Sequence, residues 1–479
     1  MRQLLPVLLL LAHLSATAQV KKAPAYPLIT HDPYFSIWSF AENINDGTTN
    51  HWTGKSMPIV GLLQVDGITY SFLGKPAPKT EIICPTGEAE SQPVRATFAQ
   101  PQSNWMNADF DDSGWQQTSL PLASALNNWN TRDVWFRRTF EFDGHQIDKL
   151  LLNIQHDDDV EVYLNAEKIF SCAPCYSGGY DQKVLAASVK EKLLKGKNLL
   201  AIHCTNTGGP GYIDAGLVNE LPETNIKKAE QQSVEMTATR TGYKMTCGPI
   251  NLELNFISPL LIQNLEMTSR PVSYLQFNYK SNDNKEHAIK MYIGVSAQLA
   301  VNSSAQEVKA SVLEGVHRTT LKAGSSTQQI LQKTGDDVRI DWGHLYVSFP
   351  SDKIAWKQDI SSSGSDYFTP SGKNFTSGKD LMLNSRATFT AKPVFGKQLI
   401  AFGYDDVESV TYFGKNLKAW WKLTGADIDK TLTNAIQHFP VIQERCVEWD
   451  NKIYQDALRA GGKKYAELCV MAYLSLIHI

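Results

Sequence analysis

The sequence predicts a mainly β protein, built from several sandwich-type domains and ending in helices. Three observations support this fold class. Short apolar runs with a period of two, such as Val160–Leu164 and Leu252–Phe256, recur between turn residues over most of the chain. From Ile428 onward, apolar residues instead recur at helical spacing. A chain of 479 residues is also long enough for about three domains.

Residues 1–18 carry the pattern of a signal peptide. Arg2 supplies the positive charge, Leu4–Leu11 the apolar core and Ala16–Ala18 the small residues of a cleavage site. The apolar run is too short to remain as a membrane-spanning helix, and no cysteine lies beside the cleavage site to take a lipid. We therefore expect an exported protein, periplasmic or extracellular, that starts near Gln19 and has no membrane anchor.

The overall composition narrows the classes of partner. A formal net charge of −3 gives no electrostatic reason to expect nucleic acid or an anionic membrane as a partner. The 11 Trp and 18 Tyr residues fit sugar-stacking platforms, although the aromatic cores of β-sandwiches account for them as well. The expected partner is a small-molecule or glycan substrate, and the sequence does not indicate the oligomeric state.

The seven cysteines leave at least one thiol unpaired within an oxidising compartment. Cys172 and Cys175 flank Ala-Pro, and they could close a small disulfide at a loop tip or remain two thiols. We do not expect zinc there, because no second close Cys or His pair accompanies them at a ligand spacing.

Residues 22–91 are expected to form a first β segment. The apolar runs on either side of Asp66-Gly67 predict a β-hairpin around that turn. His31 and Asp32 are adjacent, and His51 follows in a second polar run. A histidine near a carboxylate can act as a general acid or base or bind metal, but such groups also tie loops together. These three residues are candidate substrate-binding residues.

Residues 92–221 predict a separate β-sandwich, because strands with clean alternation follow one another between turn residues. Trp129, Arg132 and Tyr212 are candidate sugar-binding residues, since aromatic faces and guanidinium donors suit sugar rings and hydroxyls. The run Asp157–Asp159 could ligate a structural calcium ion, or form a turn held by hydrogen bonds to the backbone. No other cofactor is expected.

Residues 222–418 predict a long β-sandwich. Its most regular stretch is Asp336–Trp342, which is followed by Gly343 and a second apolar run. The alternation predicts a strand with one apolar face and one polar face. The apolar face is expected to hold Val338, Ile340 and Trp342, and the polar face Asp337, Arg339 and Asp341.

Residues 419–479 are expected to be helical. Apolar spacing predicts helices from Ile428 to Phe439, from Val441 to Ala460 and from Lys464 to Tyr473, with Gly461-Gly462 between the last two. The residues Ser475–Ile479 are expected not to be native, because the chain stops there inside a helical pattern.

Four runs resemble the glutaminase A-like family of exported proteins from Bacteroidota and fungi: Pro27–Ser39, Thr48–Lys55, Thr268–Tyr274 and Asp336–Tyr346. In that family β-sandwich regions precede an α/α toroid of the six-hairpin glycosidase type. Asp450–Tyr473 resembles the first hairpin of that toroid, so the resemblance implies a chain truncated at its C-terminus. Residues 92–221 resemble instead the galactose-binding-like jelly roll of family 2 glycoside hydrolases, here inserted between two family segments.

No G-x-S-x-G, H-E-x-x-H or Walker-type motif is present, so the sequence indicates no catalytic residue. The resemblance implies the non-catalytic β portion of an exported glutaminase-like hydrolase, whose catalytic domain is almost entirely missing from this chain. The alternatives are a portion of a six-hairpin glycoside hydrolase, or a carbohydrate-binding or scaffold protein. Whether this chain is itself an enzyme is left open.

Overall fold

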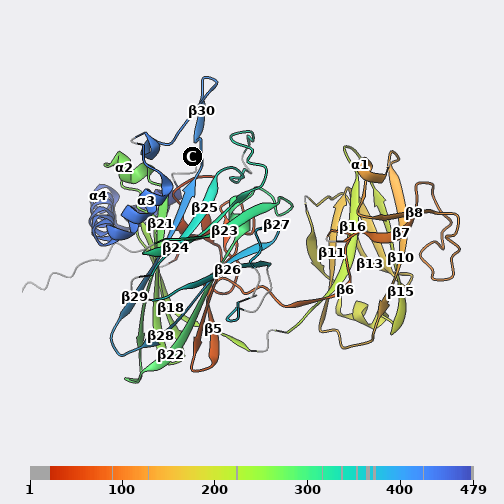
Figure 1. Ribbon diagram of the computed structural model, residues 1–479, viewed down its shortest axis with the longest axis horizontal. Coiled ribbons are helices and arrows are strands. Elements are labelled where there is room, and N and C mark those ends of the chain that lie inside the picture. Colours follow the sequence, from red (N-terminus) through yellow and green to blue (C-terminus); the bar gives the residue numbers. More distant parts are fainter. Residues whose placement is uncertain are drawn as a thin grey trace, which may run out of the picture.

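The computed structural model describes residues 22–475, except residues 89, 128, 178, 223–224, 316, 336–337, 352–353, 363–366, 371–373 and 424. It shows two β lobes side by side and a group of helices at the end remote from the smaller lobe (Figure 1). The expected signal peptide, Asp336, Asp337 and residues 476–479 lie outside the described residues. The mainly β fold class with C-terminal helices is confirmed.

The larger lobe, here the sandwich lobe (residues 22–79 and 221–417), combines two segments that are far apart in the sequence. Its six-stranded sheet has the order β17-β5-β4-β22-β28-β26, and its nine-stranded sheet the order β18-β19-β20-β21-β29-β25-β24-β23-β27. A small sheet β1-β2-β3 and a projecting hairpin β30-β31 complete it. The strands are β1 (Tyr26–Ile29), β2 (Ile37–Ser39), β3 (Asn50–His51), β4 (Ile59–Val65), β5 (Ile68–Leu73), β17 (Ile226–Lys228), β18 (Glu230–Met236), β19 (Arg240–Cys247), β20 (Ile250–Ile257), β21 (Val272–Ser281), β22 (His287–Ser296), β23 (Val308–Glu314), β24 (Arg318–Ser325), β25 (His344–Pro350), β26 (Lys357–Ser362), β27 (Ser377–Gly378), β28 (Leu381–Ala391), β29 (Gly396–Asp405), β30 (Val410–Tyr412) and β31 (Lys415–Leu417).

The hairpin predicted around Asp66-Gly67 is confirmed as the connection between β4 and β5. Both turn residues have positive φ angles, 48° for Asp66 and 89° for Gly67, as the tight turns of β-hairpins require. On its other side β4 pairs antiparallel with β22, so the N-terminal segment becomes an inner part of a sheet completed more than two hundred residues later.

The smaller lobe, here the inserted lobe (residues 80–220), consists of two facing antiparallel sheets. Their orders are β13-β12-β15-β10-β7-β8 and β14-β11-β16-β6, with β9 added beside β16. Its first strand, β6, precedes the expected domain start at Gln92. The strands are β6 (Thr80–Cys84), β7 (Gln92–Thr97), β8 (Gln116–Leu120), β9 (Leu122–Ala123), β10 (Asp133–Phe142), β11 (Lys149–Asp157), β12 (Asp159–Leu164), β13 (Glu167–Cys172), β14 (Asp181–Val184), β15 (Gly196–Thr205) and β16 (Tyr212–Glu220), with short helices α1 (Ser124–Asn127) and η1 (Ala187–Lys192).

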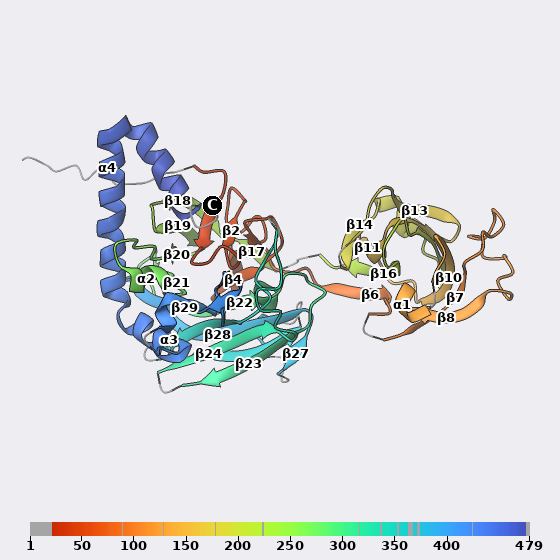
Figure 2. The same cartoon turned by 90° about the horizontal axis from the view of Figure 1, so that it is seen from above.

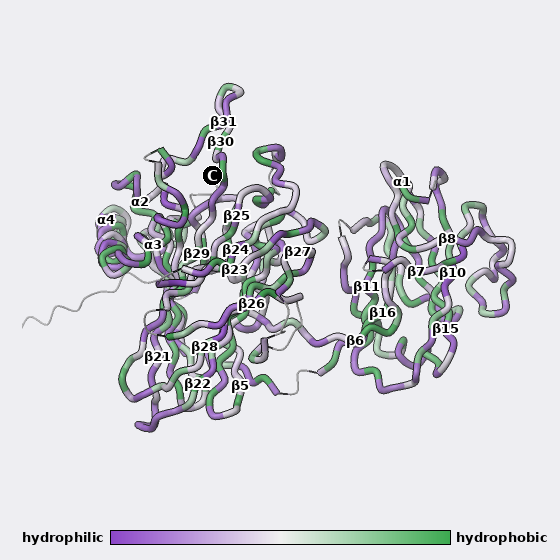
Figure 3. The backbone as a smooth tube through the Cα atoms, in the orientation of Figure 1, coloured by the Kyte–Doolittle hydropathy of each residue, from purple (hydrophilic) through white to green (hydrophobic). Residues whose placement is uncertain are grey.

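Each lobe has its own apolar core. The core of the inserted lobe is drawn entirely from residues between Ile83 and Leu217, whereas that of the sandwich lobe joins residues from both of its segments, from Tyr26 to Tyr404. Figure 3 shows apolar residues spread along the strands of both lobes. Burying a large apolar side chain stabilises a fold by about 1.5–3 kcal/mol, so each core is a separate source of stability.

The helices cover one face of the nine-stranded sheet. Val272, Tyr274 and Ala401 on the sheet pack against Leu432 and Phe439 of the helices. Outside the inserted lobe the helices are α2 (Leu265–Ser269), η2 (Ala297–Ala300), η3 (Trp420–Lys422), α3 (Ile428–Gln437) and α4 (Phe439–Tyr473), of which η2 lies in the core of the sandwich lobe rather than on this face. Figure 2 shows α4 at the opposite end of the molecule from the inserted lobe.

Local signals set the bounds of these helices. The Asp427 side chain caps α3 by accepting a hydrogen bond of 2.7 Å from the Lys430 amide. α4 is kinked at Gly462, whose φ of 77° lies outside the helical region, where the sequence predicted a break between two helices. No helix in the described part of the chain is both long enough and apolar enough to cross a membrane.

The strand predicted over Asp336–Trp342 is wrong for its described residues, 338–342. Val338–Trp342 are described and form no strand, and all five side chains are buried, Arg339 and Asp341 included. The amide of Arg339 donates to the Asn302 side chain and that of Ile340 to the Tyr34 carbonyl oxygen, so these amides bond to loops rather than to a strand. The strand β25 begins only at His344.

Candidate functional site

An acidic cluster (Asp32, Asp405 and Asp406) lies where β29 ends. The ammonium group of Lys422 pairs with the Asp405 carboxylate, and its Nζ lies 3.7 Å from Oδ1 of Asp406. Oδ1 of Asp32 accepts hydrogen bonds from the amides of Tyr34 and Phe35, at 2.8 and 3.1 Å. Segments from the start and the end of the sandwich lobe therefore place Asp32 where the charge of Asp406 acts on it, and Lys422 lies against Asp405 and Asp406.

The pKa values of two of these carboxylates are raised. Burial raises the pKa of Asp32 to about 6, and the charge of Asp406 contributes to the rise. Burial also raises the pKa of Asp406, whereas Ser409 and Lys422 oppose that shift. A carboxyl group that titrates near neutral pH can exchange a proton with a bound molecule. The cluster thus contains one sequence-predicted site residue, Asp32, whose carboxyl pKa is clearly raised.

His31 lies beside this cluster but points into the lobe. Its Nδ1 lies 2.8 Å from Oγ of Ser273, which lies 3.0 Å from Oγ of Ser258. Burial lowers the pKa of His31 to about 3, so its ring is neutral at physiological pH. Ser273 is completely buried and cannot reach a substrate. The His31–Ser273 pair therefore joins the N-terminal segment to β21 rather than forming a nucleophile–base pair.

His51, the third N-terminal candidate, belongs to a different group. Its ring is buried, and Nδ1 lies 3.0 Å from Oγ1 of Thr53. The amide of Thr53 donates to the same nitrogen at 3.3 Å. His51 therefore fixes the loop that follows β3 and leads to Gly54.

Trp129, Arg132 and Tyr212 come together at one end of the inserted lobe. Trp129 packs against Gly211, where an added Cβ would lie 2.9 Å from its ring, and Tyr212 follows in the chain. The Arg132 side chain is exposed, and its carbonyl oxygen accepts a hydrogen bond from Asn206. Trp129, however, is only 2% exposed. It offers no ring face to a sugar here, while Arg132 and Tyr212 stay predictions.

The same end of the lobe contains a carboxylate that the sequence reasoning missed. Asp214 on β16 is completely buried, and Oδ2 accepts hydrogen bonds from the Tyr180 hydroxyl and, at 2.7 Å, from the Gly87 amide. Tyr212 adds its phenolic oxygen 3.3 Å from that of Tyr180. Burial raises the pKa of Asp214 to about 6. The sequence does contain a signal for this buried carboxylate, since Asp214 is the one acidic residue inside the apolar run Ile213–Val218.

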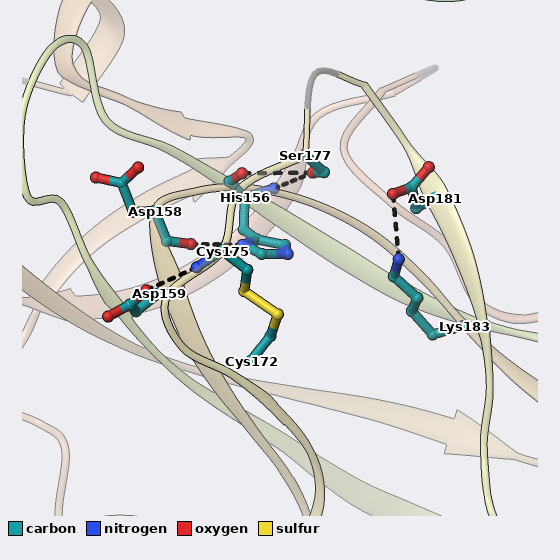
Figure 4. Close-up of a disulfide and its surroundings, with 8 residues drawn as sticks. All are labelled: His156, Asp158, Asp159, Cys172, Cys175, Ser177, Asp181 and Lys183. Atoms are coloured by element: carbon teal, nitrogen blue, oxygen red, sulfur yellow. Dashed lines mark hydrogen bonds and ion pairs between the residues drawn. A yellow bond between two sulfur atoms is a disulfide. The ribbon is translucent and has the colours of Figure 1, made fainter. Parts of the chain in front are cut away.

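Two of the carboxylates considered for calcium, Asp158 and Asp159, accept hydrogen bonds from loop backbone. Asp158 accepts from the Thr207 amide at 2.7 Å, and Asp159 from the Cys175 amide at 3.1 Å. Within the described ranges, no group of His, Cys, Asp and Glu side chains has the geometry of a metal site. The disulfide Cys172–Cys175, one of the two alternatives left by the sequence, is present beside Asp159 (Figure 4).

Two family models match the chain, and both describe domains of unknown function. DUF4964 matches residues 11–85 and DUF5127 matches residues 239–456. Glutaminase A from Aspergillus oryzae is 24% identical over 278 residues. That alignment covers 53% of this chain and 38% of the relative, so the chain spans well under half of the length of the curated relative.

Among solved structures, a glycosyl hydrolase family 2 member from Bacteroides cellulosilyticus matches with a TM-score of 0.25 and 11% identity, covering 59% of this chain and 37% of the other. A β-glucuronidase from Bacteroides uniformis matches with a TM-score of 0.25 and 11% identity over 61% of this chain and 35% of the other. Likenesses of this size identify neither the fold nor the function of the chain.

Proposed function

We propose that this chain is the β region of a hydrolase similar to glutaminase A, and that it supports the hydrolysis of L-glutamine without performing it. Helices α3 and α4 would begin the helical domain of that hydrolase. One observation carries the proposal: the two ranges matched by family models share one sheet of the sandwich lobe. β4 of the first range pairs with β22 of the second from Val65 opposite Ile289 to Ile59 opposite Val295.

The way in which the candidate groups are engaged favours a supporting role rather than a catalytic one. Amide hydrolysis needs a nucleophile or an activated water beside an acid, with both in reach of the substrate. Ser273 is out of reach, and Asp405 is paired with Lys422. Asp32 accepts two backbone amides of its own loop. These contacts hold the Asp32 loop and the end of β29 in place. A surface fixed in this way can support a second domain that packs against it.

We propose further that the protein is exported. The signal-peptide pattern of residues 1–18 supports export, and a disulfide between Cys172 and Cys175 fits an oxidising compartment. Expression with the native N-terminus, followed by N-terminal sequencing of the exported product, tests this point. The expected first residue is near Gln19, and an intact Met1 on soluble protein would contradict it.

The functional proposal is tested by ammonia release. The purified chain is incubated with L-glutamine, and glutaminase A from Aspergillus oryzae serves as the positive control. We expect no ammonia above the buffer blank from the chain, and the same result for Asp32→Asn and Asp406→Asn. A second arm assays the fungal enzyme cut down to the region that this chain matches, which should also be inactive.

Two results would overturn the supporting role. Ammonia release by the chain that disappears in Asp32→Asn or Asp406→Asn would place the catalytic groups in the acidic cluster. Full activity in the shortened fungal enzyme would show that the β region carries the reaction by itself.

A further inference from the structure

A cavity of about 730 Å³ lies between the two lobes. Residues 54–57, 298 and 301–304 line it from the sandwich lobe, together with Arg339, and Tyr176, Ser177, Gly179 and Asp181 line it from the inserted lobe. Its walls thus come from both ranges matched by family models and from the segment inserted between them. Its volume falls within the usual range for small-molecule sites.

A buried carboxylate stabilises the part of the cavity wall formed by residues 302–304, through one intervening side chain. Asp341 is completely buried, and Oδ2 accepts a hydrogen bond of 2.9 Å from Nε2 of Gln306. Oε1 of the same glutamine accepts the amides of Asn302 and Ser303, at 2.8 and 2.9 Å. Lys333 pairs with Asp341. This part of the wall is therefore preorganised rather than loose.

Arg339 is fixed in the same wall. Its guanidinium group donates through Nε to the Asn302 carbonyl oxygen at 2.8 Å, and Nη1 lies 3.4 Å from Oγ1 of Thr53. His51 in turn holds Thr53. The two sequence runs that contain His51 and Arg339 therefore meet at the cavity. The side chains of His51 and Arg339 can be buried although they are polar, because each has a hydrogen-bond partner there.

The inserted lobe supplies the opposite wall through the loop after the disulfide. Cys175 is bonded to Cys172, and Tyr176 follows with its side chain 73% exposed. Ser177 exchanges hydrogen bonds with the backbone of His156: its amide donates to the carbonyl oxygen at 2.8 Å, and its Oγ accepts the amide at 2.9 Å. Figure 4 shows this loop, with Ser177 beside His156 and Asp181 on the neighbouring strand.

The chemistry of the lining indicates a class of ligand. Among the described lining residues, four serines and two amides supply polar side chains, and Tyr176 offers an aromatic face. Lys55 is an exposed cation in the lining, and the engaged guanidinium of Arg339 is a second. The lining carboxylate, Asp181, pairs with Lys183, with 3.2 Å between Oδ2 and Nζ. Hydroxyls and amides suit the hydroxyls of a sugar, an aromatic face suits its ring, and cations suit a carboxylate. We propose that this cavity binds a short saccharide that carries a carboxylate.

The proposal is tested by isothermal titration calorimetry on the whole chain. The probes are cellobiouronic acid, its neutral counterpart cellobiose, and L-glutamate, which carries carboxylates without a sugar ring. The acidic disaccharide should bind, cellobiose should bind at least about tenfold more weakly, and L-glutamate should give no heat. The titration measures binding and not ammonia release. Its result therefore tests the cavity proposal separately from the proposed glutaminase role.

Variants connect the binding to this cavity. Lys55→Ala and Tyr176→Ala remove exposed side chains, so the fold should tolerate them, and each should weaken binding of the acidic disaccharide by about fivefold or more. Tyr412→Ala and Lys415→Ala, on the distant hairpin β30–β31, are matched controls with unchanged affinity expected. Melting temperatures of all four variants are measured alongside.

Three outcomes would overturn the proposal. The first is the absence of binding by cellobiouronic acid up to about 10 mM. The second is equal affinity for cellobiose or L-glutamate. The third is unchanged affinity in both Lys55→Ala and Tyr176→Ala.

Discussion

The carbonyl oxygen of Lys79 accepts a hydrogen bond of 2.8 Å from the amide of Leu221. These residues stand where the chain leaves the sandwich lobe and where it returns, and beyond them Thr80 pairs with Glu220 on β6 and β16. The inserted lobe is therefore attached through two neighbouring strands. The two segments of the sandwich lobe can fold as one unit because the chain leaves that lobe at Lys79 and re-enters it beside the same residue, at Leu221.

Trp342 should be a core residue of the sandwich lobe, although it does not lie on a strand. It is 2% exposed, and Nε1 donates to the Glu408 carbonyl oxygen at 3.1 Å. Trp342→Ala should cost about 3–5 kcal/mol of unfolding free energy, as truncations of buried aromatics do. The matched control is Trp420→Ala, whose side chain is 54% exposed and whose loss should cost less than about 1 kcal/mol. Equal losses in urea denaturation would contradict the burial of Trp342.

Asp450 should make stability fall as the pH rises through the weakly acidic range. It lies on α4 and accepts hydrogen bonds from Thr237 and Thr239, yet burial raises its pKa from 3.8 to about 6. The folded protein therefore holds this proton more tightly than the unfolded chain does. The resulting stability is fully present below pH 3.8 and is lost as the pH approaches 6.

The comparison that isolates this effect is Asp450→Asn, which resembles the protonated acid and does not titrate. Relative to the variant, the wild type should lose on the order of 2–3 kcal/mol between pH 4 and pH 7, measured by urea denaturation at fixed ionic strength. Parallel pH profiles for the two proteins would contradict the shift.

The cysteines should differ sharply in reactivity. Cys84, Cys204, Cys247 and Cys446 are buried, and burial raises the pKa of Cys84 to about 11 and that of Cys247 to about 12. Because the thiolate is the reactive form, these thiols should resist iodoacetamide at pH 8 in the native protein, whereas Cys469 should react. Peptide mass spectrometry reads the labelling. Equal labelling of Cys84 and Cys469 would contradict the described burial.

Local signals in the sequence predicted those parts of the fold that depend on local interactions. The Asp66-Gly67 turn specified a hairpin, and Gly461-Gly462 marked the kink in α4, because turn and helix geometry depend on neighbouring residues. Residues 338–342 were misassigned for the opposite reason. Their alternation is real, but buried partners such as Gln306 and Asn302 satisfy the polar residues, and periodicity carries no information about such partners.

The candidate site was predictable only in part. The sequence singled out Asp32, but Asp406, whose charge acts on it in the folded protein, is far from it in the sequence. No sequence motif indicates that these two residues are close in space. His31 was singled out as well, and its partner Ser273 is 242 residues away. Trp129 fitted a sugar platform by residue type alone, whereas its burial depends on how Gly211 packs against it.

The most direct test of this account is excision of the inserted lobe. Residues 80–220 are removed and Lys79 is joined to Leu221 through two glycines, a short link because the two residues are already hydrogen bonded. Thermal unfolding of the shortened protein is then followed by circular dichroism. If residues 22–79 and 221–475 form one continuous unit, the shortened protein keeps a β spectrum and unfolds in one cooperative transition. A disordered spectrum or a melt without cooperativity would contradict the account.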